Sequence, residues 1–203
     1  MSNVKLAIVY YSSTGTNYKM AKWAEETAKA EGAEVRLVRA GELAPEAAIA
    51  QNPAWEAHYN ETKDVVKEAT SEDLEWADAI IFSTATRFGG MASQMKQFLD
   101  MQGGLWAKGA LVNKVVSAMS SAQNDHGGQE ASILSLYTSL LHWGAIVAAP
   151  GYSDPVLFTT GGNPYGTSVT VDAEGNMTRD VKPAVEVQTK RTLDIASRIK
   201  AGN

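Results

Sequence analysis

The chain has 203 residues, of which 44% are hydrophobic, and it carries a formal net charge of −5 at pH 7. This length favours one α/β core with insertions over two domains. The acidic balance, without any basic stripe, argues against nucleic-acid binding, and the absence of cysteine excludes disulfides, thiolate metal sites and cysteine nucleophiles.

The three histidines, His58, His126 and His142, are too widely spaced to form a metal-ligand pattern, so no metal site is predicted. No apolar stretch approaches the length of a membrane span, and the N-terminus lacks a signal-peptide pattern. We therefore expect a cytoplasmic protein without a membrane partner.

Five short segments predict β-strands, in chain order at residues 4–10, 34–38, 79–84, 114–119 and 145–148. Four of them are mostly apolar without sustained alternation, which is typical of parallel strands covered on both faces. The segment 34–38 alternates between apolar and polar residues, which favours a position nearer a sheet edge.

Helical periodicity lies between these strands. Apolar stripes comprise Met20, Ala24 and Ala28, ending at Gly32; Met91, Met95, Phe98 and Gln102, ending at Gly103-Gly104; Ile133, Leu134, Tyr137, Leu140 and Leu141, ending at Gly144; and Val185, Leu193, Ala196 and Ile199 near the C-terminus. Alternating strands and helices predict a doubly wound parallel sheet with right-handed crossovers.

Two segments are longer than ordinary connections. Residues 41–70 are predicted to be partly helical, with Ser71 then capping a short helix through Trp76. Residues 150–180 are predicted to be loop with a short hairpin. Loops of this length in a compact domain are usually functional or interfacial. We expect a single domain over residues 1–203 that carries both as insertions.

The loop after the first predicted strand consists of Ser12, Ser13, Thr14, Gly15, Thr16 and Asn17. Its hydroxyls and the backbone N–H groups at a helix start can surround a phosphate, which the helix dipole also favours. The loop has no Lys or Arg and lacks the glycine patterns of nucleotidase and dinucleotide-binding loops, so it suits a monophosphate. The alternative is a plain helix cap and turn, which needs the same residue types.

Two further loops follow neighbouring strands, where open parallel sheets bind ligands. The first, Ala85-Thr86-Arg87-Phe88-Gly89-Gly90, offers an aromatic ring for stacking on a ring system and a cation that would favour an anionic reduced flavin. The alternatives are that Arg87 pairs with a carboxylate and that Phe88 belongs to the core.

The other loop, Ser120 to Gly128, carries amides and glycines that suit the edge of a heterocycle, and its alternative is a solvated loop in which His126 is exposed and has no role. Trp106, after Gly103-Gly104, either lines a cleft or belongs to the core.

Three motifs in this order closely resemble the WrbA-type proteins, which are flavodoxin-like NAD(P)H:quinone oxidoreductases originally named for tryptophan-repressor binding. The motifs are Tyr10-Tyr11-Ser12-Ser13-Thr14-Gly15; Thr86-Arg87-Phe88-Gly89-Gly90-Met91 with Gln94-Met95-Lys96-Gln97-Phe98-Leu99-Asp100; and Gly103-Gly104-Leu105-Trp106. Gly127-Gly128-Gln129-Glu130 and Gly162-Asn163-Pro164-Tyr165-Gly166 match further landmarks of the family, so the resemblance covers nearly the whole chain.

The resemblance implies a flavodoxin-like three-layer sandwich, with a five-stranded parallel sheet in the order 2-1-3-4-5 and helices on both faces. It also implies FMN as cofactor, NADH or NADPH as electron donor, quinones as substrates and a homotetramer. By position, Ser12 to Asn17 would hold the phosphate and ribityl chain, and Ala85, Thr86, Arg87, Phe88 and Gly89 would meet the isoalloxazine ring. Ser121, Ala122, Gln123, Asn124, His126 and Gly127 would contact its pyrimidine side, and Trp106 would wall the quinone and nicotinamide pocket.

The chain departs from the family at three places. Thr14 stands where the family often has an aromatic residue near the nicotinamide, and the third loop is about one residue longer and poorer in Gly and Thr around Gln123 to His126. Trp143 follows His142 where relatives show a second histidine, so a flavin contact from a neighbouring subunit would come from Trp143 or be lost.

The hypothesis for the reaction is that NAD(P)H gives hydride to flavin N5 and that a quinone then takes the same aromatic slot and accepts the reducing equivalents. Because the flavin carries the chemistry, no side chain is assigned a catalytic role. One alternative is an electron-carrier flavodoxin without NAD(P)H turnover. Another is a regulatory binding protein, as the old family name suggests.

Overall fold

The structure, a computed structural model, describes residues 4–202. Its strands are β1 (Lys5–Tyr11), β2 (Glu34–Arg39), β3 (Ala79–Arg87), β4 (Gly90–Met91), β5 (Val115–Ala122), β6 (Ile146–Val147) and β7 (Ser168–Thr170). Its helices are α1 (Thr16–Ala30), α2 (Glu46–Ile49), α3 (Pro53–Thr62), α4 (Ser71–Trp76), α5 (Ser93–Asp100), α6 (Gly103–Ala107), α7 (Gln129–Leu141), α8 (Val156–Thr159) and α9 (Lys182–Ala201).

The sheet has one main path with two short branches. Its order is β2-β1-β3-β5-β6, with β4 paired to β3 and β7 paired to β5. The alternating strand β2 lies at the edge, as its pattern predicts, and all pairings along the main path are parallel. This is the flavodoxin-like arrangement of a parallel sheet between helices.

The prediction of five strands in the order 2-1-3-4-5 was wrong in detail, because the sheet has seven strands. β4 is the antiparallel return of a hairpin with β3. β6 pairs with the beginning of β5 and β7 with its end, so residues between them leave the edge of the sheet and come back to it. An insertion in the edge strand was not visible in the apolar pattern, because each half is only two or three residues long.

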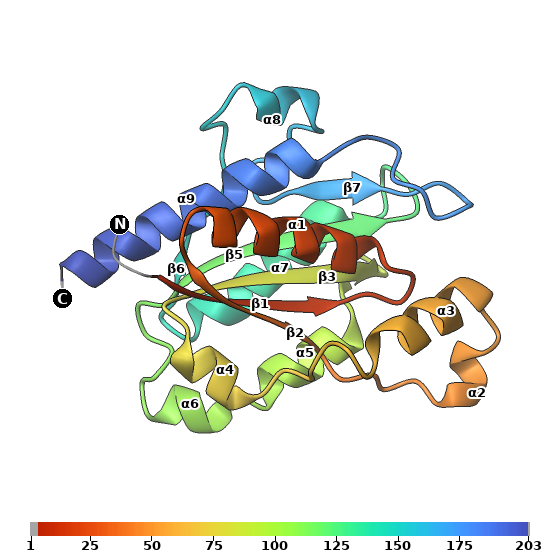
Figure 1. Cartoon of the computed structure of the whole chain (residues 1–203), viewed down its shortest axis with the longest axis horizontal. Coiled ribbons are helices and arrows are strands. Elements are labelled where there is room, and N and C mark those ends of the chain that lie inside the picture. The colour runs from red at the N-terminus through yellow and green to blue at the C-terminus, as the bar shows by residue number, and fades with distance from the viewer. Residues whose placement is uncertain (1–3, 203) are drawn as a thin grey trace.

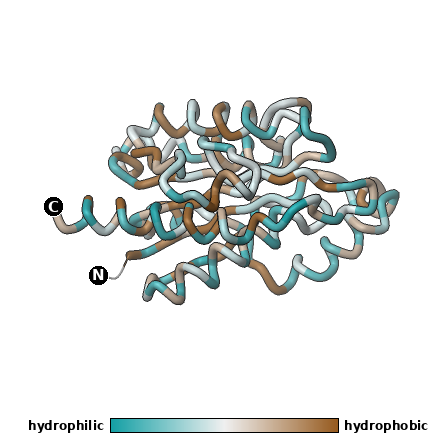
Figure 2. The backbone as a smooth tube through the Cα atoms, turned by 90° about the horizontal axis from the view of Figure 1, so that it is seen from above, coloured by the Kyte–Doolittle hydropathy of each residue, from teal (hydrophilic) through white to brown (hydrophobic). Residues whose placement is uncertain are grey.

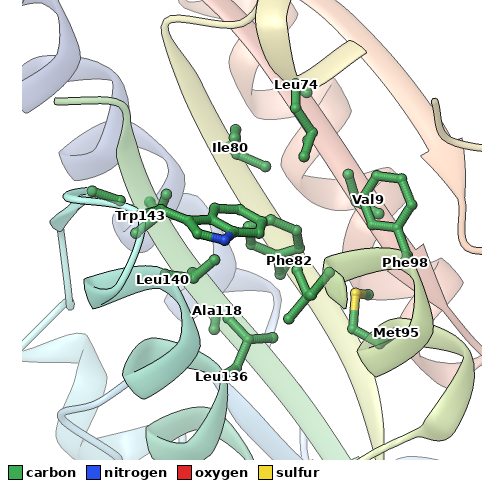
Figure 3. Packing of buried hydrophobic residues seen from close by; sticks show 14 of the residues in the cluster. Val9, Leu74, Ile80, Phe82, Met95, Phe98, Ala118, Leu136, Leu140 and Trp143 are labelled. Atoms are coloured by element: carbon green, nitrogen blue, oxygen red, sulfur yellow. The ribbon is translucent and has the colours of Figure 1, made fainter. Parts of the chain in front are cut away.

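Helices cover both faces of the sheet (Figure 1). Helices α1 and α9 pack on one face, around a cluster that includes Leu6, Ile8, Met20 and Val185. On the other face, helices α4 to α7 contribute to a cluster in which Trp143 packs edge-on to Phe82, with ring centroids 6.4 Å apart (Figure 3). The C-terminal helix alternates between polar and apolar residues along its length, as a helix with one buried face must (Figure 2).

Several predicted helix boundaries moved. Met91 lies in β4 rather than in α5. Gly103-Gly104 begins the short helix α6 instead of ending the preceding helix. Thr70, not Ser71, caps α4: its side chain and that of Asp73 form a reciprocal capping box.

Two residues of the α7 stripe face solvent. Leu134 and Leu141 are 42% and 61% exposed, while Ile133, Tyr137 and Leu140 are buried. The buried face is therefore narrower than the five-residue stripe predicted.

Both insertions contain structure. Residues 41–70 include α2 and α3, which confirms the partly helical prediction. Residues 150–180 include α8 and β7, and an antiparallel bridge between Val171 and Met177 forms the expected short hairpin. Within residues 4–202, no helix is long and apolar enough to cross a membrane.

Candidate functional site

The three predicted loops meet at one edge of the sheet. β1, β3 and β5 are adjacent and parallel, with Tyr11 opposite Thr84 and Ala85 opposite Ser121. In Figure 1 the arrowheads of these strands point toward the same side of the molecule, so the loops that follow them lie side by side. Two of these segments begin inside strands, because Ala85 to Arg87 belong to β3, and Ser121 and Ala122 to β5.

The first loop is built around the start of α1. Gly15 is the N-cap residue and has a positive φ of 96°. The Ser12 hydroxyl accepts hydrogen bonds from the backbone N–H groups of Gly15 and Asn17, at 3.0 and 3.2 Å. The loop thus already turns its N–H groups inward around an oxygen atom, which is also the arrangement that a phosphate oxygen needs. A surface cleft of about 600 Å³ opens beside it, next to Thr14, Gly15 and Thr16.

Asn17 points away from this cleft. It is 1% exposed, and its side-chain amide lies 2.7 Å from the Ser121 hydroxyl and 3.2 Å from the Ser83 hydroxyl. With the amide oxygen turned toward Ser121, that oxygen also accepts from the Ala85 N–H at 3.1 Å. Asn17 therefore joins the first loop to β3 and β5 beneath the site.

The second loop is a tight hairpin turn. Arg87 pairs with Gly90 across it, leaving Phe88 and Gly89 as its two central residues, with φ angles of 50° and 79°. Positive φ at both positions defines a type I′ turn, which favours Asn, Asp and Gly over an aromatic residue. Phe88 is nonetheless fully exposed, so the alternative that it belongs to the core was wrong.

Arg87 reaches across to the first loop. One guanidinium N–H group donates to the Ser13 hydroxyl at 3.0 Å, and another donates to the Thr86 carbonyl at 3.3 Å. Among residues 4–202 no carboxylate forms an ion pair with it, contrary to the alternative of carboxylate pairing. Its positive charge is therefore available at the mouth of the site.

A cluster of hydroxyls fixes Thr86. Its Oγ1 lies 3.0 Å from Ser120 Oγ and accepts from Ser132 Oγ at 3.1 Å, while Ser120 Oγ also contacts the Thr84 carbonyl at 3.0 Å. Ser132 lies on α7 and was not predicted at the site. The signal that the sequence offers for it is a serine next to Ile133 on the mostly apolar, buried face of α7.

The third loop packs tightly against the second. A Cβ atom on Gly128 would lie 2.6 Å from the Cα of Gly89, and one on Gly127 would lie 2.3 Å from the Cβ of Ala122. Both glycines are required by this close approach. Gln123, Asn124 and His126 are exposed on the outer side of the loop.

A second cleft of about 640 Å³ runs along this loop, between α7 and residues 161–179. Arg179 from the second insertion lines both clefts, and no sequence motif distinguishes it from other surface arginines.

The first insertion is tied to the site through Glu42, another residue missed in the sequence. Its carboxylate accepts from the Tyr11 hydroxyl at 3.1 Å, the Trp55 indole N–H at 3.2 Å and the Gln94 amide at 2.6 Å. Burial first, and the negative charge of Glu42 second, raise the pKa of Tyr11 above its usual value, so Tyr11 stays protonated and donates.

The two tryptophans that were predicted at the site, Trp106 and Trp143, lie away from the three loops. Trp106 is 59% exposed on α6, and its indole N–H donates to the His142 carbonyl at 3.0 Å. Trp143 is only 8% exposed and packs in the core (Figure 3). Helix α6 and strand β6 lie toward the side where β3 begins, opposite to the three loops (Figure 1). Within one chain, neither tryptophan joins the loops.

Two relatives with known names match nearly the whole chain. A protein from Deinococcus radiodurans named NAD(P)H dehydrogenase (quinone) is 50% identical over 196 residues, which cover 97% of each chain. A protein of the same name from Brucella abortus is 41% identical over 205 residues, which cover 97% of this chain and 98% of that protein.

Solved structures agree on the fold. The WrbA-like flavodoxin from Agrobacterium tumefaciens has a TM-score of 0.61 at 19% identity, over 99% of this chain and all of that one. The flavoenzyme NAD(P)H:(acceptor) oxidoreductase FerB from Paracoccus denitrificans has a TM-score of 0.59 at 16% identity, over 96% of this chain and 98% of that one. These likenesses support the flavodoxin-like fold.

The family model described as NADPH-dependent FMN reductase matches residues 4–153, which span the sheet path from β1 to β6 and all three loops. Together with relatives that are up to 50% identical over nearly the whole chain, this match leads to one conclusion. The chain belongs to the NADPH-dependent FMN reductase family.

Proposed function

We propose that this protein is an FMN-dependent NAD(P)H:quinone oxidoreductase of the WrbA type, which reduces quinones by two electrons. The observation that carries the proposal is the 50% identity, over 97% of both chains, to a protein named NAD(P)H dehydrogenase (quinone). The convergence of the three loops at the carboxyl edge of the sheet is consistent with it, because that edge is where such sheets bind ligands.

The donors of the first loop fit a flavin mononucleotide. The hydroxyls of Ser12, Ser13, Thr14 and Thr16, with the N–H groups at Gly15, would hold its phosphate and ribityl chain. Asn17 would act from below, through its bonds to Ser83 and Ser121. Bound FMN would supply the redox chemistry, taking hydride from NAD(P)H and passing two electrons to a quinone.

The second and third loops would position the ring. Phe88, exposed at a turn position that aromatic residues disfavour, offers a flat apolar contact, and such local strain is characteristic of functional sites. Arg87, without a carboxylate partner among the described residues, would favour negative charge on the reduced ring. Thr86, with Ala85 and Gly89, would line the same face, and Ser121, Ala122, Gln123, Asn124, His126 and Gly127 would border its polar edge.

The proposal includes a homotetramer in the cytoplasm and a single domain over residues 1–203. The position of helix α6 supports the oligomer: its Trp106 is exposed, yet the helix lies opposite to the loops of its own chain (Figure 1). Trp106 would therefore meet the quinone only from a neighbouring subunit, and Thr14 would face the same pocket from within the chain. Trp143 is buried in its own core, which favours loss of the flavin contact over its transfer to this residue.

Two measurements test the function. The purified protein should bind FMN and turn yellow, and the loaded protein should oxidise NADH or NADPH only when a benzoquinone is added. Yellow protein without turnover would instead support an electron-carrier flavodoxin. Failure to bind FMN would reject both flavin functions.

A further inference from the structure

His58 lies directly beneath the first loop, although it comes from the first insertion. It is on α3 and is 7% exposed. Its ring packs against Tyr18 on α1, with ring centroids 5.4 Å apart, and Tyr18 in turn packs against Tyr10 on β1 at 5.1 Å. The first insertion, residues 41–70, thus places an imidazole next to the start of α1.

The imidazole faces the turn at Gly15. A Cβ atom at Gly15 would lie 3.5 Å from His58 Nδ1, so this nitrogen faces the N-cap of the 15-residue helix α1. In the part of the chain that the structure describes, neither ring nitrogen has a hydrogen-bond partner. The unused nitrogens border the same cleft as Thr14, Gly15 and Thr16.

The surroundings keep the free imidazole neutral. Burial lowers the pKa of His58 below its usual value, and the negative charge of Glu61, on the same helix, opposes this shift only in part. Burial also raises the pKa of Tyr10, which packs on the far side of Tyr18, so Tyr10 adds no charge near the ring.

Other charges border His58 from farther around it. Arg39 and Glu42 line the small cavity on its inner side. Lys19, Arg179 and Asp180 line the outer cleft. The first loop itself has no Lys or Arg, so the charges beside it come from other elements, and they include Arg87 of β3, which donates to Ser13.

We propose that His58 is a phosphate-recognition residue. When a phosphate monoester occupies the N-terminus of α1, the imidazole takes up a proton and its N–H group binds the phosphate. The proposal rests on the proposed function in naming FMN as the monoester. The two negative charges of a bound phosphate monoester would favour the protonated imidazole and offset the cost of burying its positive charge. Because binding and protonation are linked, lower pH strengthens phosphate binding through His58, and bound phosphate raises the pKa of His58 by an equivalent amount.

Histidine NMR on the wild-type protein tests this without a substitution in the site. His58, His126 and His142 give three imidazole signals, and the His58 signal is assigned by its loss in His58→Gln. FMN should raise the pKa of His58, whereas riboflavin, which has no phosphate, should leave it unchanged. Saturating inorganic phosphate should raise it as well, which shows that the phosphate group is the source.

Binding measurements provide the second arm. The ratio of the FMN Kd at pH 8.5 to that at pH 5.5 should be larger in wild type than in His58→Gln, by up to about tenfold for each unit of pKa increase that falls between these two pH values. The monoester gains its second charge near pH 6 in both proteins, so the comparison removes that effect. Riboflavin affinity should be equal in the two proteins. His142→Gln, exposed beyond the C-terminus of α7, should behave as wild type.

The outcomes separate the two proposals. If FMN binds and the pKa of His58 does not move, or if riboflavin moves it equally, the role of His58 is overturned while the flavin function stands. If inorganic phosphate moves it but FMN does not bind, the phosphate site is supported and the flavin function is rejected. If neither ligand binds, both are rejected.

Discussion

At the scale of single residues, Phe88 shows a conflict between stability and function. A fully exposed phenylalanine contributes no buried area, and its φ of 50° lies in the left-handed region that costs a non-glycine residue about 1–2 kcal/mol. Among the described residues, the exposed side chain buries no surface that would offset this cost. The compensation is expected from a ligand ring that covers the exposed side chain.

Phe88→Asn should therefore stabilise the FMN-free protein while weakening the site. Asparagine suits the first central position of a type I′ turn, so the free energy of unfolding should rise by about 0.5–1 kcal/mol, and flavin binding should weaken. Urea denaturation measures the first effect. Phe158→Asn, at an exposed helical position, is the matched control and should bring no such gain. A loss of stability in Phe88→Asn would refute the argument from strain.

Asn17 has the opposite character, because its side chain supports the fold rather than the ligand. Asn17→Ala would leave the buried hydroxyl of Ser121 without its partner, at a cost of about 1–3 kcal/mol, whereas Ser83 would keep the main-chain carbonyl of residue 17 as acceptor. We expect unfolding of the FMN-free protein at a clearly lower urea concentration. An unchanged midpoint would show that Asn17 acts only through the cofactor.

At the scale of elements, the β3–β4 hairpin and the start of α7 hold each other in place. Gly128 has a positive φ of 93° and lies so close to Gly89 that there is no room for a side chain between them. The contact is between backbones, which cannot move aside as a flexible side chain can. The hairpin that presents Phe88 therefore depends on a glycine in another loop.

Gly128→Ala should displace this hairpin. The positive φ alone costs about 1–2 kcal/mol, and the 2.6 Å approach to Gly89 adds to that cost, so both stability and flavin affinity should fall. Gly104→Ala, in helix α6 with nothing within 4 Å of the added carbon, is the control. It should be neutral or stabilise by up to about 1 kcal/mol, because alanine is the better helix former. Equal effects in both variants would contradict the packing argument.

At the scale of the whole molecule, the two ends of the sheet hold different parts of the proposed site. The three loops lie where the strands end, and helix α6, which carries Trp106, lies toward the side where they begin (Figure 1). A chain cannot bring its own Trp106 to its own loops without unfolding, whereas a symmetric assembly places one end against the other.

Light scattering of the FMN-loaded protein should give four times the chain mass of 21.7 kDa. On dilution, quinone reduction per chain should fall as the mass falls, because each pocket would lose the tryptophan of its neighbour. A monomer with full activity would rule out a shared pocket.

The sequence predicted much of the architecture, because burial leaves a local pattern. The apolar runs of β1, β3 and β5 and the alternation of β2 identified a parallel sheet and its edge strand. The split edge strand was missed, since β6 and β7 are too short to show a pattern. Thr70 was missed as the cap of α4 because Ser71, next to it, is an equally suitable residue type.

For the candidate site too, some features were predictable from the sequence and others were not. The sequence by itself determined that three polar, glycine-containing loops follow neighbouring strands and meet at one edge of the sheet, because strands and loops leave local patterns along the chain. Only the tertiary structure decided that Asn17 points into the core, that Phe88 is exposed, and that His58 and Glu42 reach the first loop from an insertion. Such contacts join residues that are tens of positions apart, and they depend on how whole elements pack rather than on any pattern along the chain.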